Sequence, residues 1–191
     1  MANEFYALLG RMRYITRWGL MRNTFSENIQ EHSHQVAVLA HALALIRREI
    51  LKLPCPDPDK CAVAALYHDA TEILTGDMPT PIKYYNPDIK VAYKQVERIA
   101  GERLLKMVPQ ELVDCYADLI LEDDAEIAAI VKAADKLSAY LKCVEEQKAG
   151  NTEFDSAEAT TMRSMQAMNR PELDWFIENC LEPFRLNLDQ L

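Results

Sequence analysis

Glycine and cysteine are both scarce in this 191-residue chain. The five glycines are spread over the whole length, which leaves few positions for glycine-rich phosphate-binding loops or for the tight turns of an all-β fold. The five cysteines are odd in number and form no C-x-x-C pair, so we expect neither a disulfide framework nor a thiolate zinc site. This usage is typical of a soluble protein in the reducing cytoplasm.

Long apolar runs and positive charge are lacking as well. No apolar run approaches the roughly 18 residues of a membrane-spanning helix. The first residues carry charges throughout and lack the apolar segment of a secretory signal. The formal net charge of −9 argues against the clustered Lys and Arg that a nucleic-acid polymer requires. We therefore expect neither a membrane nor a nucleic-acid polymer as partner, although one cation or metal could still bind a small anion.

The residues that are abundant favour helices. The chain contains 23 Ala and 22 Leu against 9 Val and 8 Thr, a balance that disfavours a large sheet. Its length, with no internal repeat and no linker, predicts one domain over residues 1–191. The fold class that we predict is all-α, a single helical bundle of about six to eight helices.

Capping residues mark where several of these helices begin. The pattern Asn28-x-x-Glu31 predicts a capping box and a helix running to about residue 52. Asp57 followed by Pro58 predicts the start of a helix over about 58–74, which is apolar nearly all round and so belongs at the centre of the bundle. Further helices are expected over residues 3–13, about 87–108, from Asp123 or Asp124 to Gly150, about 154–169 and 171–186, with a loop over 75–81.

The pair His68-Asp69 lies inside that central apolar stretch. A buried carboxylate requires a partner, and a divalent metal would satisfy both side chains. Taken alone, such a pair is more often exposed at a helix surface. Glu72 follows four residues after His68, which on a continuous helix places it on the same side.

Two other helices supply residues of the same kind. His32 shares an apolar stripe with Val36, Leu39, Leu43, Ile46 and Ile50, so it is expected to face the core. Asp135 flanks the apolar face of the long helix that precedes Gly150. Each alone is more often a satisfied core histidine or a solvated aspartate. Together with His68 and Asp69 they offer four ligands from three helices, as in the metal sites of helical bundles.

The order Glu31-His32-Ser33, His68-Asp69-Ala70-x-Glu72 and Asp135 resembles the H…HD…D signature of the HD-domain metal-dependent phosphohydrolases. Four further segments resemble the YfbR-type 5′-deoxynucleotidases: Arg17-Trp18-x-Leu20-Met21-Arg22-Asn23, Glu27-Asn28, Tyr67-His68-Asp69 and Leu74-Thr75-Gly76-Asp77-Met78-Pro79-Thr80-Pro81. The resemblance covers nearly the whole chain and is weakest in the C-terminal helices. It implies an all-α homodimer that removes the 5′ phosphate from deoxyribonucleoside monophosphates with a divalent metal.

The resemblance also assigns roles to residues. His32, His68, Asp69 and Asp135 would bind one divalent transition metal, such as Co²⁺ or Mn²⁺, and the absence of histidine between Asp69 and Asp135 favours a single ion. Glu72 would accept the proton of the attacking water, and Arg17 would orient the phosphate. The substrate-binding set that we predict is Arg17, Trp18, His32, Asp69, Asp77, Met78, Pro79, Thr80 and Asp135.

Other interpretations of these residues remain open at this point. The same site could hydrolyse another nucleotide, such as a triphosphate or a phosphodiester. A domain that binds a metal without catalysis is a further alternative, against which the intact Glu72 counts. Without the resemblance, Arg17-Trp18 would be a cation beside a core aromatic ring, and residues 77–80 an ordinary turn.

Overall fold

The computed structural model describes residues 4–83, 85–121 and 124–191, without the side chains of Thr80 and Pro81, and most of these residues lie in helices. Within this part of the chain there is no strand, and Thr16 and Asn28 form only an isolated bridge. Eight of the α-helices described are longer than four residues, which confirms the all-α prediction. The α-helices are α1 Phe5–Leu9, α2 Ile29–Leu45, α3 Pro58–Tyr67, α4 Glu72–Thr75, α5 Thr80–Lys83, α6 Pro87–Leu105, α7 Val113–Leu121, α8 Ala125–Lys148, α9 Asp155–Gln166 and α10 Pro171–Cys180.

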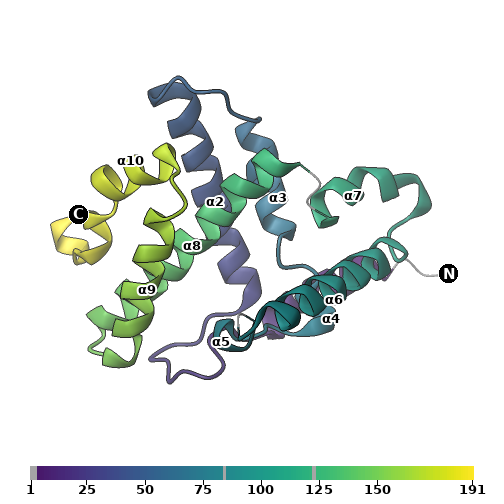
Figure 1. Ribbon diagram of the computed structural model, residues 1–191, viewed down its shortest axis with the longest axis horizontal. Helices are drawn as coiled ribbons and strands as arrows, with labels where there is room; N and C mark the ends of the chain where they lie inside the picture. Colours follow the sequence, from purple (N-terminus) through teal and green to yellow (C-terminus); the bar gives the residue numbers. More distant parts are fainter. Residues whose placement is uncertain (1–3, 84, 122–123) are drawn as a thin grey trace.

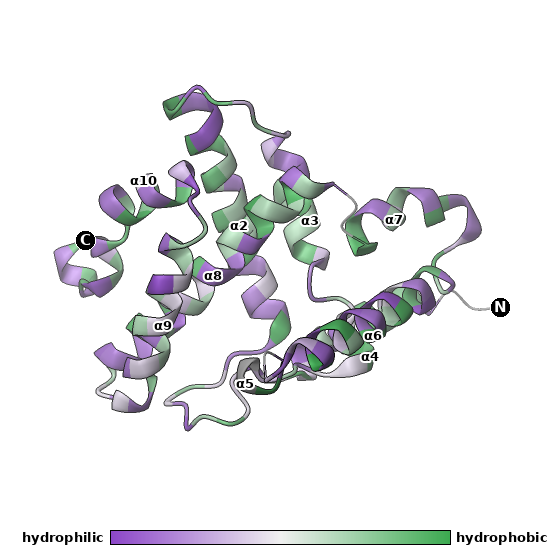
Figure 2. Ribbon diagram, viewed as in Figure 1, coloured by the Kyte–Doolittle hydropathy of each residue, from purple (hydrophilic) through white to green (hydrophobic). Residues whose placement is uncertain are grey.

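Helices α2, α3 and α8 pack against one another at the centre of the molecule (Figure 1). Helices α9 and α10 lie on one side of this centre, and α6 and α7 lie on the other. The larger apolar core joins α2, α3 and α8 to α9 and α10, and the part of α3 beside α8 is coloured hydrophobic in Figure 2. A smaller core contains Phe5, Ala70 and Leu104. The segment that follows α3 therefore lies between the two cores.

The predicted caps are present. The Asn28 side chain accepts a hydrogen bond from the backbone N–H of Glu31 at 3.0 Å, and the Glu31 carboxylate accepts one from the backbone of Asn28. The Asp57 carboxylate caps α3, with Pro58 as the first helical residue. Asp124 caps α8 by accepting from two backbone N–H groups, whereas Asp123 lies outside the described residues. Helix α8 ends just before Gly150, whose φ of 80° is one that glycine adopts easily.

Two expected helices differ in detail from the structure. After α2 the chain continues as a π-helical turn over Ile46–Ile50, which widens the turn and changes its register. As a result Ile50 is 49% exposed, while the other members of its predicted stripe are buried. The helix expected over 58–74 is divided into α3 and the single turn α4, and His68 to Thr71 form the turn between them.

A side chain explains why α3 ends at Tyr67. His68 Nδ1 lies 2.7 Å from the carbonyl oxygen of Ala65, an acceptor that a continuing α-helix would offer to the backbone N–H of Asp69. The backbone then forms hydrogen bonds of the 3-10 type, between residues three apart. The Ala70 N–H donates to the Tyr67 carbonyl at 2.9 Å, and the Glu72 N–H donates to the Asp69 carbonyl at 3.0 Å. His68 and Asp69 thus lie in a tight turn rather than in a helix interior.

Smaller differences affect element ends. The first helix continues as a 3-10 helix over Gly10–Tyr14, and the last ends at Cys180 before a 3-10 helix over Glu182–Arg185. The predicted loop over 75–81 is shortened to residues 76–79, because α4 includes Thr75 and α5 begins at Thr80. Among the described helices, none combines the length and apolar character that crossing a membrane requires.

Candidate functional site

The four residues predicted as metal ligands meet between α2, α3 and α8. His32 Nε2 lies 3.2 Å from Asp135 Oδ1 and 3.6 Å from Asp69 Oδ2. His68 Nε2 lies 3.1 Å from the same Asp69 oxygen, and the two imidazole rings are 5.3 Å apart. His32, His68 and Asp135 each offer one ligand atom, and these atoms all lie within 4.8 Å of one another. We call these four residues the ligand cluster.

Hydrogen bonds to the opposite ring nitrogens direct both Nε2 atoms into the ligand cluster. Ser138 Oγ donates to Gln35 Oε1 at 2.6 Å, so its oxygen is left to accept from His32 Nδ1–H at 3.1 Å. His68 Nδ1–H donates to the carbonyl of Ala65. In the neutral imidazole, these bonds leave Nε2 of each ring as the nitrogen that can bind a metal. Both Nε2 atoms are also buried and have no hydrogen-bond partner among the described residues.

The electrostatics of the ligand cluster favour a cation between these atoms. Burial lowers the pKa of His68, but the Asp69 carboxylate outweighs it and raises the value to about 9. Burial raises the pKa of Asp69, yet His68, His32 and Arg17 together hold it well below its ordinary value. Burial raises the pKa of Asp135 as well, yet the neighbouring His32, Lys136 and Arg17 together hold it well below its ordinary value. Two imidazole nitrogens and two ionised carboxylates are a donor set that fits a divalent cation.

Glu72 opens α4 directly after the turn that carries His68 and Asp69. Its side chain is buried, and Oε2 has no hydrogen-bond partner among the described residues. Burial, together with the carboxylates of Asp69 and Asp77, raises the pKa of Glu72 to about 9. The shift shows that Glu72 shares the electrostatic environment of the ligand cluster.

Arg17 reaches the ligand cluster from the segment that precedes α2. Its Nη1 donates to Asp69 Oδ2 at 3.4 Å, and its Nε donates to Glu27 Oε2 at 3.0 Å. Burial lowers the pKa of Arg17, but the carboxylates of Asp69 and Asp135 outweigh it and raise the value. The side chain is only 12% exposed, so Arg17 is a fixed, partly desolvated cation.

Trp18 is held by protein groups on both sides. Its indole N–H donates to Glu27 Oε2 at 3.0 Å, and its ring packs on Phe154 with centroids 5.3 Å apart. Its φ of 59° lies in the left-handed region, which is unfavourable for a bulky residue. In this structure the indole N–H that could bind a substrate is therefore already engaged.

The segment between α4 and α5 contains the remaining predicted residues. Asp77, Met78 and Pro79 are half-buried, and the side chain of Thr80 lies outside the described part of the structure. Burial raises the pKa of Asp77, while nearby Arg17 opposes the increase. This interaction places Asp77 close to the charges of the site. The Pro79 carbonyl accepts backbone hydrogen bonds from Ile82 and Lys83 in α5.

Two residues of this site went unassigned in the sequence. Glu27 occurs in a segment that resembles the YfbR type, but nothing in the segment reveals that its carboxylate contacts two neighbouring side chains. Ser138 lies three residues after Asp135, and this spacing places both residues on the same face of α8. The spacing is the one sequence feature that indicates a role for Ser138 beside the ligand cluster.

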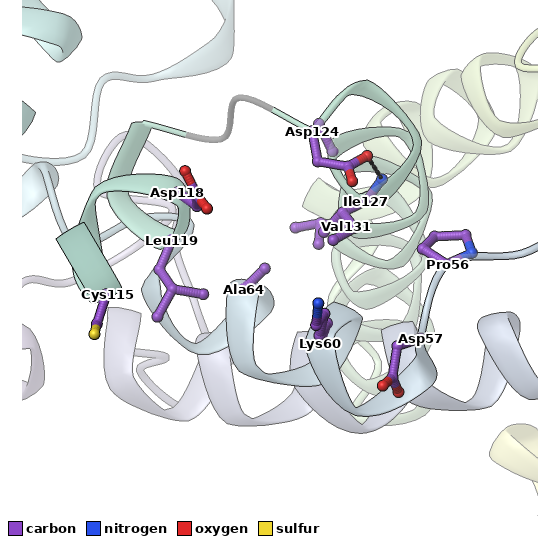
Figure 3. A pocket seen from close by; sticks show the side chains of 11 residues that line it. Pro56, Asp57, Lys60, Ala64, Cys115, Asp118, Leu119, Asp124, Ile127 and Val131 are labelled. Atoms are coloured by element: carbon purple, nitrogen blue, oxygen red, sulfur yellow. Dashed lines mark hydrogen bonds between the residues drawn. The ribbon is translucent and has the colours of Figure 1, made fainter.

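A separate cavity of about 460 Å³ lies between α3, α7 and α8 (Figure 3). Ala64, Leu119, Ile127 and Val131 form its apolar part, and none of the predicted site residues lines it. Asp124, at its rim, is engaged by the N-terminus of α8. The ligand cluster, rather than this cavity, is therefore the candidate functional site.

Comparison with known proteins agrees with this geometry. The family model described as 5′-deoxynucleotidase YfbR-like matches residues 4–184. The chain belongs to this family. It is 48% identical to a 5′-deoxynucleotidase of Erwinia tasmaniensis, covering 99% of this chain and 96% of the relative, and 46% identical to 5′-deoxynucleotidase YfbR of Shigella boydii with the same coverage.

Solved structures agree with the family at the level of the fold. The HD-domain phosphohydrolase of Listeria innocua superimposes with a TM-score of 0.80 at 18% identity, over 95% of this chain and 88% of the other. The cyanophage S-2L HD phosphohydrolase, solved with dA and one catalytic Zn²⁺ ion, gives a TM-score of 0.66 at 22% identity, over 92% and 95%. The YfbR-like chain described here thus has the HD phosphohydrolase fold.

Proposed function

We propose that residues 1–191 form one HD-type domain that acts as a metal-dependent 5′-deoxynucleotidase, which converts deoxyribonucleoside 5′-monophosphates to deoxyribonucleosides and phosphate. The observation that carries the proposal is the pair of buried, unpartnered Nε2 atoms that face two carboxylates, with Arg17 beside them. Membership of the YfbR-like family supports this choice of reaction and substrate.

In this proposal His32, His68, Asp69 and Asp135 hold one divalent transition metal per chain, such as Co²⁺ or Mn²⁺. When bound, the ion supplies Lewis acidity toward a phosphoryl oxygen and acidity to a coordinated water. The chain offers two histidines and two carboxylates, a mixed donor set that several such ions accept. The absence of histidine between Asp69 and Asp135 supports a single ion.

The chain's own residues then supply proton transfer and orientation. Glu72, buried beside Asp69 and without a hydrogen-bond partner on Oε2 in the described structure, is placed to accept the proton of the attacking water. A cation held by the ligand cluster would lower the raised pKa of Glu72 toward the ionised form that this role requires. The N–H groups of Arg17 that Glu27 and Asp69 do not occupy are available to the phosphate. The substrate would also contact Trp18 and the ligand residues His32, Asp69 and Asp135.

The segment Asp77, Met78, Pro79 and Thr80 would bind the sugar. Asp77 is half-buried and lies near Arg17, so a sugar held there would sit next to the phosphate subsite. A closely fitted sugar site can exclude a 2′ hydroxyl, because an added polar group that clashes or lacks a partner lowers the rate strongly. We therefore propose a preference for deoxyribose over ribose.

We further propose that the protein is a cytoplasmic homodimer. All five cysteines are free, which supports a reducing compartment. Val38 on α2 and Val63 and Leu66 on α3 are exposed, and an apolar outer face on two packed helices supports association with a second copy. Light scattering after gel filtration tests the oligomeric state directly.

Phosphate release tests the function. The protein is stripped with a chelator, reloaded with individual divalent metals and assayed on matched deoxy- and ribonucleoside 5′-monophosphates. We expect activity only with metal, about one equivalent of metal per chain, and faster hydrolysis of the deoxy series. His68→Ala should lose metal and activity, whereas His41→Ala, a histidine outside the ligand cluster, should lose neither.

Equal efficiency on the two sugar series would contradict the deoxyribose preference. Products from a nucleoside triphosphate or a phosphodiester, with no release from monophosphates, would favour a different hydrolase on the same site. Metal binding without phosphate release from any of these compounds would favour a non-catalytic domain.

A further inference from the structure

A single carboxylate oxygen holds both residues of the Arg17-Trp18 pair. Glu27 Oε2 accepts from Arg17 Nε at 3.0 Å and from the indole N–H of Trp18 at 3.0 Å. The same two chain segments are also joined through the backbone, where Arg17 N–H donates to the Glu27 carbonyl at 2.9 Å. The Glu27 side chain is only 12% exposed, so this contact is largely shielded from water.

The two hydrogen bonds of the guanidinium fix its orientation. A guanidinium is planar, so anchoring Nε on Glu27 and Nη1 on Asp69 determines where its other N–H groups point. Without Glu27, Arg17 would be free to turn both of its Nη groups onto Asp69, the other carboxylate that it contacts. Glu27 thus prevents the Arg17 guanidinium from forming a closer ion pair with Asp69, a predicted metal ligand.

The backbone at Trp18 points to a positioning role beyond simple stability. A bulky residue at a φ of 59° is strained, and such strain persists only where surrounding contacts enforce it. Here the enforcing contacts are the Glu27 carboxylate and the ring of Phe154. Strain of this kind is concentrated at functional sites.

We infer that Glu27 is a positioning residue, which orients the Arg17 guanidinium toward the phosphate subsite beside the ligand cluster. The inference rests on the proposed function, in which Arg17 binds the substrate phosphate. It predicts that Glu27 acts through Arg17. If Glu27 only stabilises the segment before α2, its substitution should lower activity and phosphate affinity whatever residue occupies position 17.

A double-mutant cycle separates these two roles. The metal-loaded wild type, Glu27→Ala, Arg17→Lys and the double variant are compared in kcat and KM with a deoxyribonucleoside 5′-monophosphate. The dissociation constant of inorganic phosphate is measured by calorimetry on the same proteins. Lysine keeps the charge but lacks the Nε–H that Glu27 accepts. Glu178→Gln, an exposed glutamate on α10, is the charge control.

We expect Glu27→Ala to lower kcat/KM and phosphate affinity by about 10- to 100-fold, the usual effect of losing a charged hydrogen bond. Glu27→Gln retains an acceptor and should lose less, about 3- to 10-fold. In the Arg17→Lys background, Glu27→Ala should change kcat/KM and phosphate affinity by less than about twofold, because the Nε–H contact through which Glu27 acts is already absent. Metal content should stay at the wild-type level.

Additive effects of the two substitutions would overturn the inference, and so would a Glu27→Ala variant with wild-type values. Loss of metal from Glu27→Ala would also overturn it, because Glu27 would then act on the ligand cluster. If Glu27→Ala does not fold, the cycle is run with Glu27→Gln. If the wild type releases no phosphate, the proposed function fails, and the phosphate-binding cycle still decides the role of Glu27.

Discussion

His32 and His68 present the same ring nitrogen to the ligand cluster for different local reasons. His68 is held by a backbone carbonyl within its own turn, whereas His32 depends on Ser138 from another helix. A side chain can be removed without breaking the helix, so the His32 arrangement can be tested.

We predict that Ser138→Ala folds but binds metal about 10- to 100-fold more weakly, the usual effect of losing an outer-shell partner of a metal-binding histidine. Without the hydroxyl, His32 Nδ1 loses its partner and the tautomer is no longer enforced. Titration against a competing chelator measures the affinity. The control is Ser164→Ala at an exposed position of α9. Unchanged affinity in Ser138→Ala would show that the ring is oriented without this hydrogen bond.

Glu72 should separate catalysis from metal binding. We predict that Glu72→Ala retains its metal and binds nucleotide, while kcat falls by roughly 10²- to 10⁴-fold, the usual contribution of a positioned general base. Metal analysis and steady-state kinetics on the same preparation test this. Parallel loss of metal and activity would make Glu72 a ligand, and near-normal turnover would place the base elsewhere.

At the scale of elements, the segment before α2 is anchored to the end of α8. Lys142 Nζ donates to the Phe25 carbonyl at 2.9 Å and to Glu146, and both side chains of this ion pair are buried. Glu146 also accepts from the backbone N–H and the hydroxyl of Thr24 and from Asn151. The segment that carries Arg17 is therefore tied to the helix that carries Asp135.

We predict that Glu146→Leu destabilises the fold by about 3–5 kcal/mol, because it leaves the Lys142 ammonium buried without its counter-charge. A Lys142→Met, Glu146→Leu double variant should recover most of this loss, since the stranded charge is removed as well. Urea unfolding of the three proteins measures the difference. Equal instability of the single and double variants would show that the hydrogen bonds to Thr24 and Asn151 dominate instead.

The same carboxylate gives a pH dependence. Burial raises the pKa of Glu146, but hydrogen bonds from Lys142, Asn151 and Thr24 outweigh it and lower the value to about 2. A carboxyl with a lowered folded pKa stabilises the fold above its unfolded value, near 4.3. We therefore predict that the contribution of Glu146 disappears as the pH falls from about 4.3 to about 2. The free energy of unfolding of Glu146→Gln, measured by urea titration at several pH values, should change less over this range than that of the wild type.

Helix type and helix starts were predictable because they depend on local chemistry. Caps such as Asn28 with Glu31 and Asp57 with Pro58 act within one turn. The periodicity of the helices placed His32 on the inward face of α2 and Asp135 beside the apolar face of α8. Convergence of the ligand cluster followed from these faces.

The parts that could not be predicted depend on distant or side-chain contacts. The division of the expected helix 58–74 follows from the contact of the His68 ring with a backbone carbonyl, which apolar periodicity does not encode. The contacts of Glu27 with Arg17 and Trp18 depend on how an irregular segment folds back on itself. Neither contact repeats with a helical period, so neither leaves a pattern in the sequence.

At the scale of the whole molecule, the ligand cluster joins helices that are far apart in the chain. We predict that a saturating divalent metal raises the unfolding temperature, because an ion that binds only the folded state stabilises it by about 4 kcal/mol at a thousandfold excess over its Kd. Calorimetry with metal and with chelator measures the shift. His41→Ala should retain the shift and His68→Ala should lose it. An unchanged unfolding temperature in the loaded wild type would contradict binding at this site.

One face of α8 carries residues with three different tasks, spaced three or four positions apart: Asp135, Ser138, Lys142 and Glu146. They face, in order, the ligand cluster, His32, Phe25 and Thr24. One inserted residue would rotate everything beyond it by about 100° and advance it by about 1.5 Å, so no single insertion between these positions preserves all four contacts. The length of α8 between Asp135 and Glu146 is therefore fixed by these contacts, and we expect an inserted residue to be tolerated in a connecting segment but not here.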